Sequence, residues 1–273
     1  MAADGAMTTD TITIPAPAPR TRPSGRALLA VSPASEPPEQ ARSVGEERFA
    51  GYIAHELRNP LATQRALLEL TLTDPLADAA SWRDVAGDVL AACMEQERLL
   101  EACLTLARSR CGLTRHELVD LAAIADEVLR AYDLSGLESV VALGPAVVCG
   151  DPVLVERLAA NLVSNAIRHN VPGGRIAVET RTEAGHVFLV TANTGPLIPA
   201  GELGRLFEPF HRLDPYAGPL SDGIGLGLPI VQAIAGAHNA NLTAEALSGG
   251  GLKIDVRFPV APSRGCSAAG RPE

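Results

Sequence analysis

Two stretches of the chain repeat apolar residues at the three- and four-residue spacing of an amphipathic helix. The first begins near Val44 and stops before Pro75, which keeps the preceding residue out of helical geometry. The second covers residues 85–107, and Gly112 follows it as a C-cap. Two such helices joined by a short loop form a hairpin that leaves one apolar face open. We expect two copies to close that face as a four-helix bundle, so the pattern predicts a homodimer.

Beyond Gly112 the spacing changes to short apolar runs between turn residues, which is typical of an α/β domain. Asp120 and Asp151 each precede a helical pattern as N-caps, and Pro152 suits the first helical position. The apolar runs predict three strand pairs, which are residues 139–143 with 146–149, 175–181 with 187–192, and 241–246 with 252–258. The sequence therefore predicts an α + α/β protein, with a helical hairpin followed by an α/β sandwich.

The two ends of the chain lack these patterns. Residues 1–43 are rich in Pro-Ala, Pro-Ser and Pro-Pro steps, which block helices and strand ladders, so we expect a disordered leader. If this leader docks on a partner, Arg26–Val31 is its anchor. We expect the hairpin to occupy residues 44–111, the α/β domain residues 112–260, and a flexible tail residues 261–273.

Composition removes several classes of function. The 273 residues carry a formal charge of -9, which does not suggest a nucleic-acid-binding surface. Charged residues interrupt every apolar stretch before the roughly 18 residues that a membrane span requires, and the chain starts without a secretory pattern. The five cysteines include no CxxC pair, so we expect free thiols. These features predict a cytoplasmic protein without a membrane span of its own, able to work with a membrane-bound or soluble sensory partner.

The first helical stretch places a histidine on its outer side. Ile53 and Leu57 take the core side, and His55 lies about 200° from Ile53 at 100° per residue. Asn59 follows His55 by four residues and so shares its face, one turn on. Glu56 is adjacent in sequence and reaches the imidazole only through its flexible side chain. An exposed imidazole with an unperturbed pKa near 6.5 is available as a neutral nucleophile at pH 7.

The heptapeptide HELRNPL at residues 55–61 resembles the H box of two-component sensor histidine kinases. The resemblance implies that His55 accepts the γ-phosphoryl group of ATP and that Glu56 orients or deprotonates it. It also implies that Asn59 helps water to attack a phosphorylated response regulator in a phosphatase reaction.

The helix after Asp151 carries a polar stripe. Asn161 and Asn165 stand four residues apart, and Arg168 and His169 continue the stripe. Asparagine is a poor helix former, so stacked amides in a helix indicate a role for their oxygen atoms. The segment resembles the N box of the same kinases. The resemblance implies that Asn165 is a Mg²⁺ ligand, Asn161 lines the same wall, Arg168 contacts phosphate, and His169 packs on the nucleotide, although His169 could equally be a packing residue.

Asn193 and Gly195 come directly after the second strand pair and occupy the place of the G1 box. In the family an aspartate at the first position accepts a hydrogen bond from the adenine amino group. An asparagine oxygen can still accept this bond but lacks the negative charge. We therefore expect adenine binding to persist, weaker by about 1 kcal/mol or more.

A further stretch, which contains Phe207 and Phe210, resembles the F box. Residues 213–222 follow it and are rich in Pro and Gly, and we expect them to form a mobile lid. The glycine-rich run at residues 222–231 then resembles the G2 box. Glycines allow close approach of the backbone to phosphates, and the helix that follows offers free N–H groups. The residues implied in nucleotide binding here are Gly223, Gly225, Gly227 and Leu228.

These boxes occur in family order over residues 45–260, so the chain resembles a sensor histidine kinase with a dimeric four-helix bundle and a Bergerat-type ATP-binding domain. The resemblance implies autophosphorylation of His55 with ATP and Mg²⁺, and transfer to an aspartate of a response regulator receiver domain. One alternative is a catalytically degenerate module that binds nucleotide or regulator, which Asn193 favours. Others are a regulator that acts mainly as a phosphatase and a serine kinase with the same ATP fold, against which HELRNPL argues.

Overall fold

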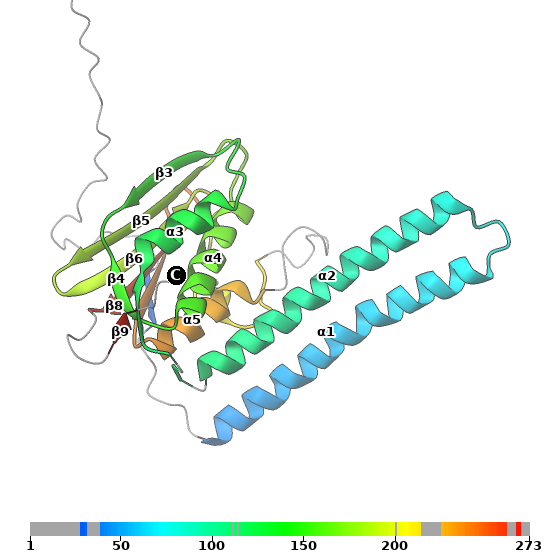
Figure 1. Ribbon diagram of the computed structural model, residues 1–273, viewed down its shortest axis with the longest axis horizontal. Coiled ribbons are helices and arrows are strands. Elements are labelled where there is room, and N and C mark those ends of the chain that lie inside the picture. Colours follow the sequence, from blue (N-terminus) through cyan, green and yellow to red (C-terminus); the bar gives the residue numbers. More distant parts are fainter. Residues whose placement is uncertain are drawn as a thin grey trace, which may run out of the picture.

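A long helical arm projects from a mixed α/β body in the computed structural model of the chain (Figure 1). The arm is a hairpin, and the body holds the remaining helices and the strands. The structure describes residues 28–31, 39–110, 112–113, 115–199, 201–213, 225–260 and 266–268.

The arm consists of α1 (Glu39–Thr73) and α2 (Ala79–Arg110), joined by a short turn. Helix α1 ends where the sequence pattern predicts. Asp78 starts α2, because its Oδ1 accepts the backbone N–H groups of Ala80 and Ser81 at 3.0 and 2.9 Å. The predicted hairpin is therefore confirmed, and it places the start of α1 and the end of α2 beside the body (Figure 1).

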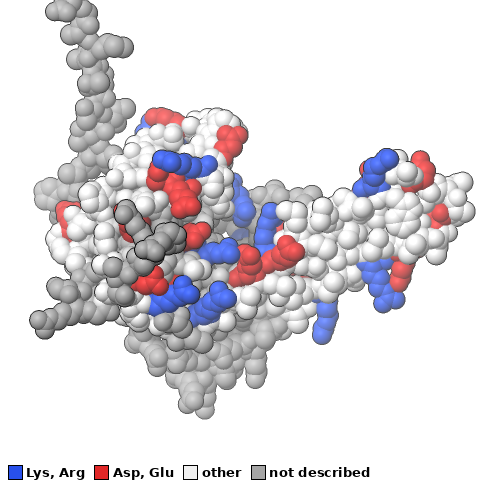
Figure 2. Space-filling model, viewed as in Figure 1, with Lys and Arg blue, Asp and Glu red and all other residues white. Residues whose placement is uncertain are grey.

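Much apolar surface remains exposed along the arm. Leu76 at its tip is 86% exposed, and Leu70, Leu72 and Leu90 are also largely exposed. Figure 2 shows scattered charged groups separated by uncharged surface on this arm. Exposed apolar side chains of this kind are ones that a second protein chain can cover. Among the described residues, no helix is both long enough and apolar enough to cross a membrane.

Six strands form the main sheet of the body, in the order β1-β7-β8-β6-β5-β3. Neighbours are antiparallel except β3 and β5, which are parallel. Helices α3, α4 and α5 cover one face of the sheet (Figure 1), and their apolar sides make the core with it. The bounds are β1 Leu28–Val31, α3 Leu121–Arg130, β3 Glu138–Leu143, α4 Pro152–Arg168, β5 Arg175–Glu183, β6 His186–Asn193, α5 Gly227–Ala237, β7 Asn241–Ala246 and β8 Leu252–Pro259.

A small second sheet has the order β4-β2-β9, with β2 Glu117–Asp120, β4 Val147–Gly150 and β9 Ser267–Ala268. The predicted pairing of residues 139–143 with 146–149 is wrong, because β3 pairs with β5 and β4 pairs with β2. Gly144 N–H donates to the Thr180 carbonyl of β5 at 2.9 Å. The pairing with β5 therefore continues one residue past β3 before the chain crosses to the other sheet. The other two predicted pairs are confirmed.

Both ends of the chain contribute strands that the sequence pattern does not reveal. Within the predicted disordered leader, β1 pairs antiparallel with β7, and α1 begins at Glu39 rather than near Val44. Within the predicted tail, β9 pairs in parallel with β2. The prediction of unstructured ends is therefore wrong for these segments. The rest of the leader and of the tail lies outside the described residues.

Aspartate caps fix the starts of α3 and α4, as predicted. Asp120 accepts from the N–H groups of Ala122 and Ala123, and Asp151 accepts from those of Val153 and Leu154. A buried histidine then ties α4 to α5. His238 Nδ1 lies 2.8 Å from the Ile234 carbonyl oxygen, and its Nε2 accepts from Asp151 N–H at 3.2 Å.

Burial lowers the pKa of His238, so the neutral tautomer with its proton on Nδ1 is favoured. This tautomer matches both contacts of the ring, because a charged imidazole has no acceptor nitrogen to offer Asp151. His238 therefore fixes the start of α4 against the end of α5.

A disulfide joins Cys149 of β4 to Cys266 just before β9, 117 residues along the chain. The prediction of free thiols is therefore wrong for this pair. The small sheet accounts for the error, since β9 and β4 lie on the two sides of β2 and bring both cysteines together. Cys93 and Cys103 are free, and Cys111 lies outside the described residues.

We expect Cys266→Ser to lower the free energy of unfolding of the body by about 2–4 kcal/mol, because the disulfide closes a long loop and restricts the unfolded chain. Thermal unfolding with and without dithiothreitol measures the effect. The reductant should destabilise the wild type and leave the variant unchanged. Equal melting temperatures of oxidised and reduced wild type would contradict this expectation.

The arm and the body meet along α2. Leu99 and Leu106 of α2 are buried in the same apolar core as the residues of α4 and α5. An ion pair at the edge of this contact joins Arg157 of α4 to Glu101 of α2 at 3.0 Å. Both side chains are half exposed, so the pair orients the surfaces more than it stabilises them. This junction orients the arm against the body.

Candidate functional site

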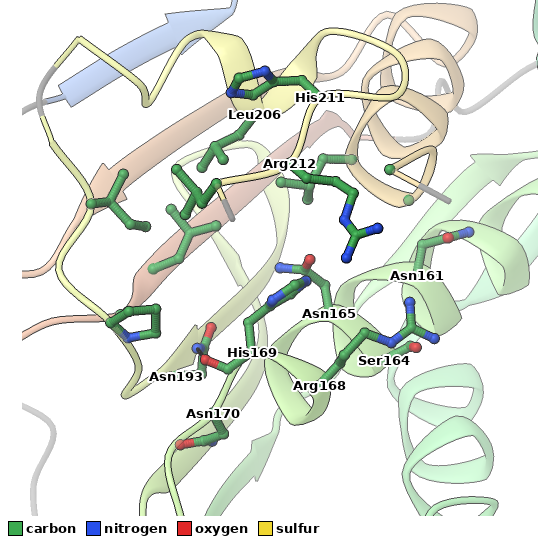
Figure 3. Close-up of a pocket in the computed structure, with 18 of the residues that line it drawn as sticks. Asn161, Ser164, Asn165, Arg168, His169, Asn170, Asn193, Leu206, His211 and Arg212 are labelled. Carbon is green, nitrogen blue, oxygen red and sulfur yellow. Dashed lines mark hydrogen bonds between the residues drawn. The ribbon is translucent and has the colours of Figure 1, made fainter. Parts of the chain in front are cut away.

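A cavity of about 320 Å³ opens in the body between α4, the end of β6 and the start of α5. Its size lies in the range of small-molecule sites. Figure 3 shows amide, guanidinium and imidazole groups lying around it. The lining residues are Asn161, Ser164, Asn165, Arg168, His169, Asn170, Asn193, Pro196, Ile198, Leu206, His211, Arg212, Leu213, Gly225, Gly227, Leu228, Pro229, Gly251 and Leu252.

Helix α4 supplies one wall. Asn161, Asn165 and Arg168 follow one another at four and three residues, so they share one face of the helix. Asn161 Nδ2 donates to the Arg157 carbonyl at 2.7 Å, which fixes that amide on its own helix. Within the described part of the chain, no hydrogen bond holds the Asn165 side chain. Its amide is therefore available to a ligand in the cavity.

Asn193 ends β6 at the deep side of the cavity and is only 5% exposed. Its Nδ2 donates to the Thr194 carbonyl at 2.8 Å and lies 3.5 Å from the His169 carbonyl. Oδ1 is then the atom of this amide that can accept a hydrogen bond from a ligand. A carboxylate at this position would face the two carbonyl oxygens instead, so asparagine suits its surroundings.

Gly195 is not among the lining residues, but its lack of a side chain allows the end of β6 to pack closely against the end of α4. A Cβ atom at this position would lie 2.5 Å from the His169 carbonyl oxygen, too close for any side chain. Thr194 Oγ1 bonds Asn170 Oδ1 at 2.6 Å and receives the Arg175 N–H at 2.7 Å. The end of α4 and the end of β6 are therefore joined directly, and Gly195 acts through this packing.

The F-box phenylalanines also lie outside the lining. Phe207, in the 3₁₀ turn Arg205–Phe207, is 6% exposed and packs in the core. Phe210 has φ of 67°, a left-handed conformation that is unusual for an aromatic residue. Its N–H donates to the Gly225 carbonyl at 2.9 Å. These residues hold the loop, and the residues that follow Phe210 line the cavity.

Two positive side chains approach the cavity from different elements. Arg168 comes from α4, and Arg212 comes from the loop after Phe210, and both extend toward the cavity in Figure 3. Beside them His211 Nε2 lies 2.9 Å from Glu202 Oε2, and Glu202 Oε1 accepts a hydrogen bond from Arg205 at 2.8 Å. The pKa of Glu202 is lowered, chiefly by its hydrogen bond from Arg205. The cavity therefore offers guanidinium groups to an anion.

The N-terminus of α5 closes the remaining side. Gly225, with φ of 73°, Gly227 and Leu228 line the cavity there, and Gly223 lies outside the described residues. Among the described residues, no side-chain cap hydrogen bond is made at Leu226, so the first N–H groups of α5 can bind an anion. A polyphosphate ligand matches both this helix end and the two arginines.

His55 lies on the arm and is exposed, whereas Ile53 and Leu57 are half buried, as predicted. Asn59 Nδ2 lies 3.2 Å from His55 Nε2, which joins the two predicted functional side chains on one face of α1. In the described part of the chain, no hydrogen bond links Glu56 to the imidazole. Its carboxylate bonds the hydroxyl of Tyr52, one turn earlier.

The cavity thus collects most of the nucleotide-binding residues expected from the sequence. Sequence reasoning missed Ser164, which the helical spacing from Asn161 and Asn165 could have found. It also missed His211 and Arg212, which directly follow Phe210 within the F box. The apolar lining residues Ile198, Leu206 and Leu252 carry no signal in the sequence, because only the fold brings them together.

Two families match the chain. Residues 46–112 match the family described as the His Kinase A (phospho-acceptor) domain. Residues 150–262 match the family described as the histidine kinase-, DNA gyrase B-, and HSP90-like ATPase. The first match covers the arm, and the second covers the part of the body that contains the cavity.

The chain is 42% identical over 226 residues to the sensor protein CutS of Streptomyces coelicolor, which covers 81% of this chain and 54% of CutS. The chain therefore spans about half the length of this curated relative. The solved mycobacterial sensor histidine kinase MprB is 32% identical, covers 54% of this chain and 99% of its own, and has a TM-score of 0.48.

The solved histidine kinase ThkA, in complex with the response regulator protein TrrA, covers 82% of this chain and 65% of its own. Its TM-score is 0.57 at 17% identity, which shows a shared fold of helical hairpin and α/β domain.

Proposed function

This chain belongs to the sensor histidine kinases, and we propose that it transfers the γ-phosphoryl group of ATP to its own His55. We assign residues 44–111 to dimerisation and phosphoacceptance and residues 112–260 to ATP binding. The observation that carries the proposal is one cavity that unites the Asn165 amide, two arginines and the N-terminus of α5. An exposed histidine on the arm of the same chain supplies the acceptor.

In this proposal the adenine lies at the deep side of the cavity, where Asn193 Oδ1 accepts a hydrogen bond from the adenine amino group. The phosphates lie between α4 and the start of α5, where Arg168 and Arg212 balance their charge. The Asn165 oxygen is a hard ligand of the kind that Mg²⁺ takes, with phosphate oxygens and water completing the shell. When bound, Mg²⁺ supplies charge neutralisation of the phosphates.

The reaction that we propose is an in-line displacement at the γ-phosphorus. A lone pair of the His55 imidazole forms the N–P bond as the P–O bond to ADP breaks, and the second ring nitrogen loses its proton. Glu56 is the nearest carboxylate in sequence and takes the role of orienting the ring or accepting that proton. For this role it must leave the Tyr52 hydroxyl.

We propose that the phosphoryl group then passes to an aspartate on the receiver domain of a response regulator. Support comes from the fold shared with ThkA, a kinase whose solved structure contains the response regulator TrrA. The exposed apolar face of the arm supports a homodimer, in which a second copy covers that face. Because ATP and receiver domains are found in the cytoplasm, we propose that the phosphoacceptor and ATP-binding domains of this chain lie there.

A second activity is favoured by one contact. The Asn59 amide lies beside His55 on an exposed surface of α1, where it can hold a water molecule against a phosphorylated receiver domain. We propose this phosphatase role for Asn59 in addition to the kinase reaction. Loss of regulator dephosphorylation in Asn59→Ala, with autophosphorylation retained, would support it.

The proposal is tested by incubating the purified chain with Mg-ATP labelled at the γ-phosphate. The protein should acquire label that survives alkali and is lost in acid, as expected of phosphohistidine. Binding of ATP without any labelling would contradict kinase activity and indicate a degenerate nucleotide-binding module.

We expect Asn193→Ala to weaken binding of ADP about tenfold, because one buried hydrogen bond to the base is lost. Binding of GDP, which lacks the adenine amino group, should change less. Titration of both nucleotides against the wild type and the variant measures this ratio. An unchanged ADP-to-GDP ratio would show that Asn193 does not contact the base.

A further inference from the structure

One aromatic contact joins the arm to the loop of the nucleotide cavity. Tyr52 of α1 stacks on Phe210, with ring centroids 3.8 Å apart and ring planes at 27°. Paired aromatic rings contribute more than area burial alone. Tyr52 belongs to the same chain as the cavity, and its role rests on the function proposed above.

The loop side of the contact is held rigidly. Phe210 adopts its left-handed backbone conformation because its N–H bonds the Gly225 carbonyl, and Gly225 itself has a positive φ. A Cβ atom at Gly225 would lie 2.9 Å from the Cα of Phe210. Strained aromatic residues of this kind persist where the surroundings determine them and are concentrated at functional sites. The backbone of Phe210 is thus held by its contact with Gly225 rather than by the arm.

On the arm, Tyr52 lies one helical turn before the acceptor His55. Tyr52 precedes His55 by three residues and Glu56 by four, so these side chains share one side of α1. The pKa of Tyr52 is raised by partial burial and by the charge and hydrogen bond of Glu56, and Arg212 opposes this rise. Arg212 also lines the cavity. Arg212 of the cavity wall therefore acts electrostatically on Tyr52, and Tyr52 lies on α1 one turn before His55.

We propose that Tyr52 is a positioning residue that seats the nucleotide domain on the acceptor helix of its own chain, so that phosphoryl transfer to His55 occurs within one chain. The stack on Phe210 sets the position of the nucleotide domain along the axis of α1. The ion pair between Arg157 and Glu101 and the buried side of α2 set its rotation. Together they place the cavity of one chain next to the His55 of that chain rather than of its partner.

The positioning role is tested with Tyr52→Ala and Tyr52→Phe in the full chain. Tyr52→Ala should lower the rate of autophosphorylation at saturating ATP about tenfold, because misplacement of reacting groups is costly, while KM for ATP stays unchanged. Tyr52→Phe keeps the ring and should restore most of the rate. Arg65→Ala, an exposed change later in α1, serves as the control.

An equal rate for Tyr52→Ala and the wild type would overturn the positioning role. A faster Tyr52→Ala would overturn it too, because the stack would then hold the domain away from His55. A loss shared by Tyr52→Phe would contradict the role of the ring and leave the hydroxyl as the essential group.

Transfer within one chain is tested with mixed dimers, prepared by co-expression of two differently tagged chains and purification over both tags. The first dimer pairs His55→Gln with Asn165→Ala. The second pairs the wild type with a chain that carries both substitutions. Transfer within a chain labels only the second dimer, and transfer between chains labels only the first.

Label on the first dimer and none on the second would overturn the inference and leave the proposed kinase function intact. A wild-type homodimer that acquires no label would instead contradict the proposed function itself. The two failures are therefore separate.

Discussion

Replacing His55 by glutamine should abolish transfer of the γ-phosphate label from Mg-ATP to the protein. Glutamine keeps a polar side chain of similar reach but offers no nucleophilic ring nitrogen, so no N–P bond can form. His55 is exposed and its only described hydrogen-bond contact is with Asn59, so the change should not disturb the fold. The measurement is the initial rate of labelling, with ATP binding determined on the same preparation.

Two comparisons make this result decisive. Asn59→Ala removes the hydrogen bond to His55 but keeps the nucleophile, so it should remain labelled. His116→Gln removes an exposed histidine of the body and should behave as the wild type. Labelling of His55→Gln at the wild-type rate would show that another residue is the acceptor.

Asn165→Ala should lower the rate of autophosphorylation about 100-fold. The Asn165 amide is the proposed protein ligand of the metal ion, and loss of such support typically costs 10–100-fold or more. The alanine variant should still bind nucleotide in the absence of Mg²⁺, because Asn193 and the arginines remain. Initial rates over a range of Mg²⁺ concentrations, together with ADP titrations with and without Mg²⁺, measure both effects.

Asn161→Ala is the matched control, because it changes the same residue type one turn earlier on α4. Its amide already donates to the Arg157 carbonyl, so its loss should cost much less than that of Asn165. If Asn161→Ala were the more damaging change, or if Asn165→Ala kept the dependence on Mg²⁺, the metal would have to be held elsewhere.

The parts of the fold that depend on local chemistry were predictable from the sequence. The caps at Asp120 and Asp151, the hairpin turn after β5 and the outward side of α1 at His55 each follow from a few neighbouring residues. The polar stripe of α4 was likewise visible, because helical spacing places Asn161, Asn165 and Arg168 together. These residues now lie along one wall of the cavity.

The parts that depend on distant partners were not predictable. β3 and β4 are neighbours in sequence, but each gains more by pairing with a distant strand than by pairing with the other. β1 and β9 are too short to show a period, and they form only because an edge is available to them. The stack of Tyr52 on Phe210 likewise arises only when the arm and the body pack together.

The strand β1 has a mechanical consequence for the whole chain. Its pairing with β7 anchors the sheet to the chain just before α1, and the seven residues between Val31 and Glu39 span at most about 25 Å. A second connection runs from the end of α2 to β2 through six residues. A body tethered at two separate points loses most of its freedom to tumble and can turn mainly about the line through both anchors. Displacement of the start of α1 would then be transmitted through β1 to the sheet and would rotate the body about that line.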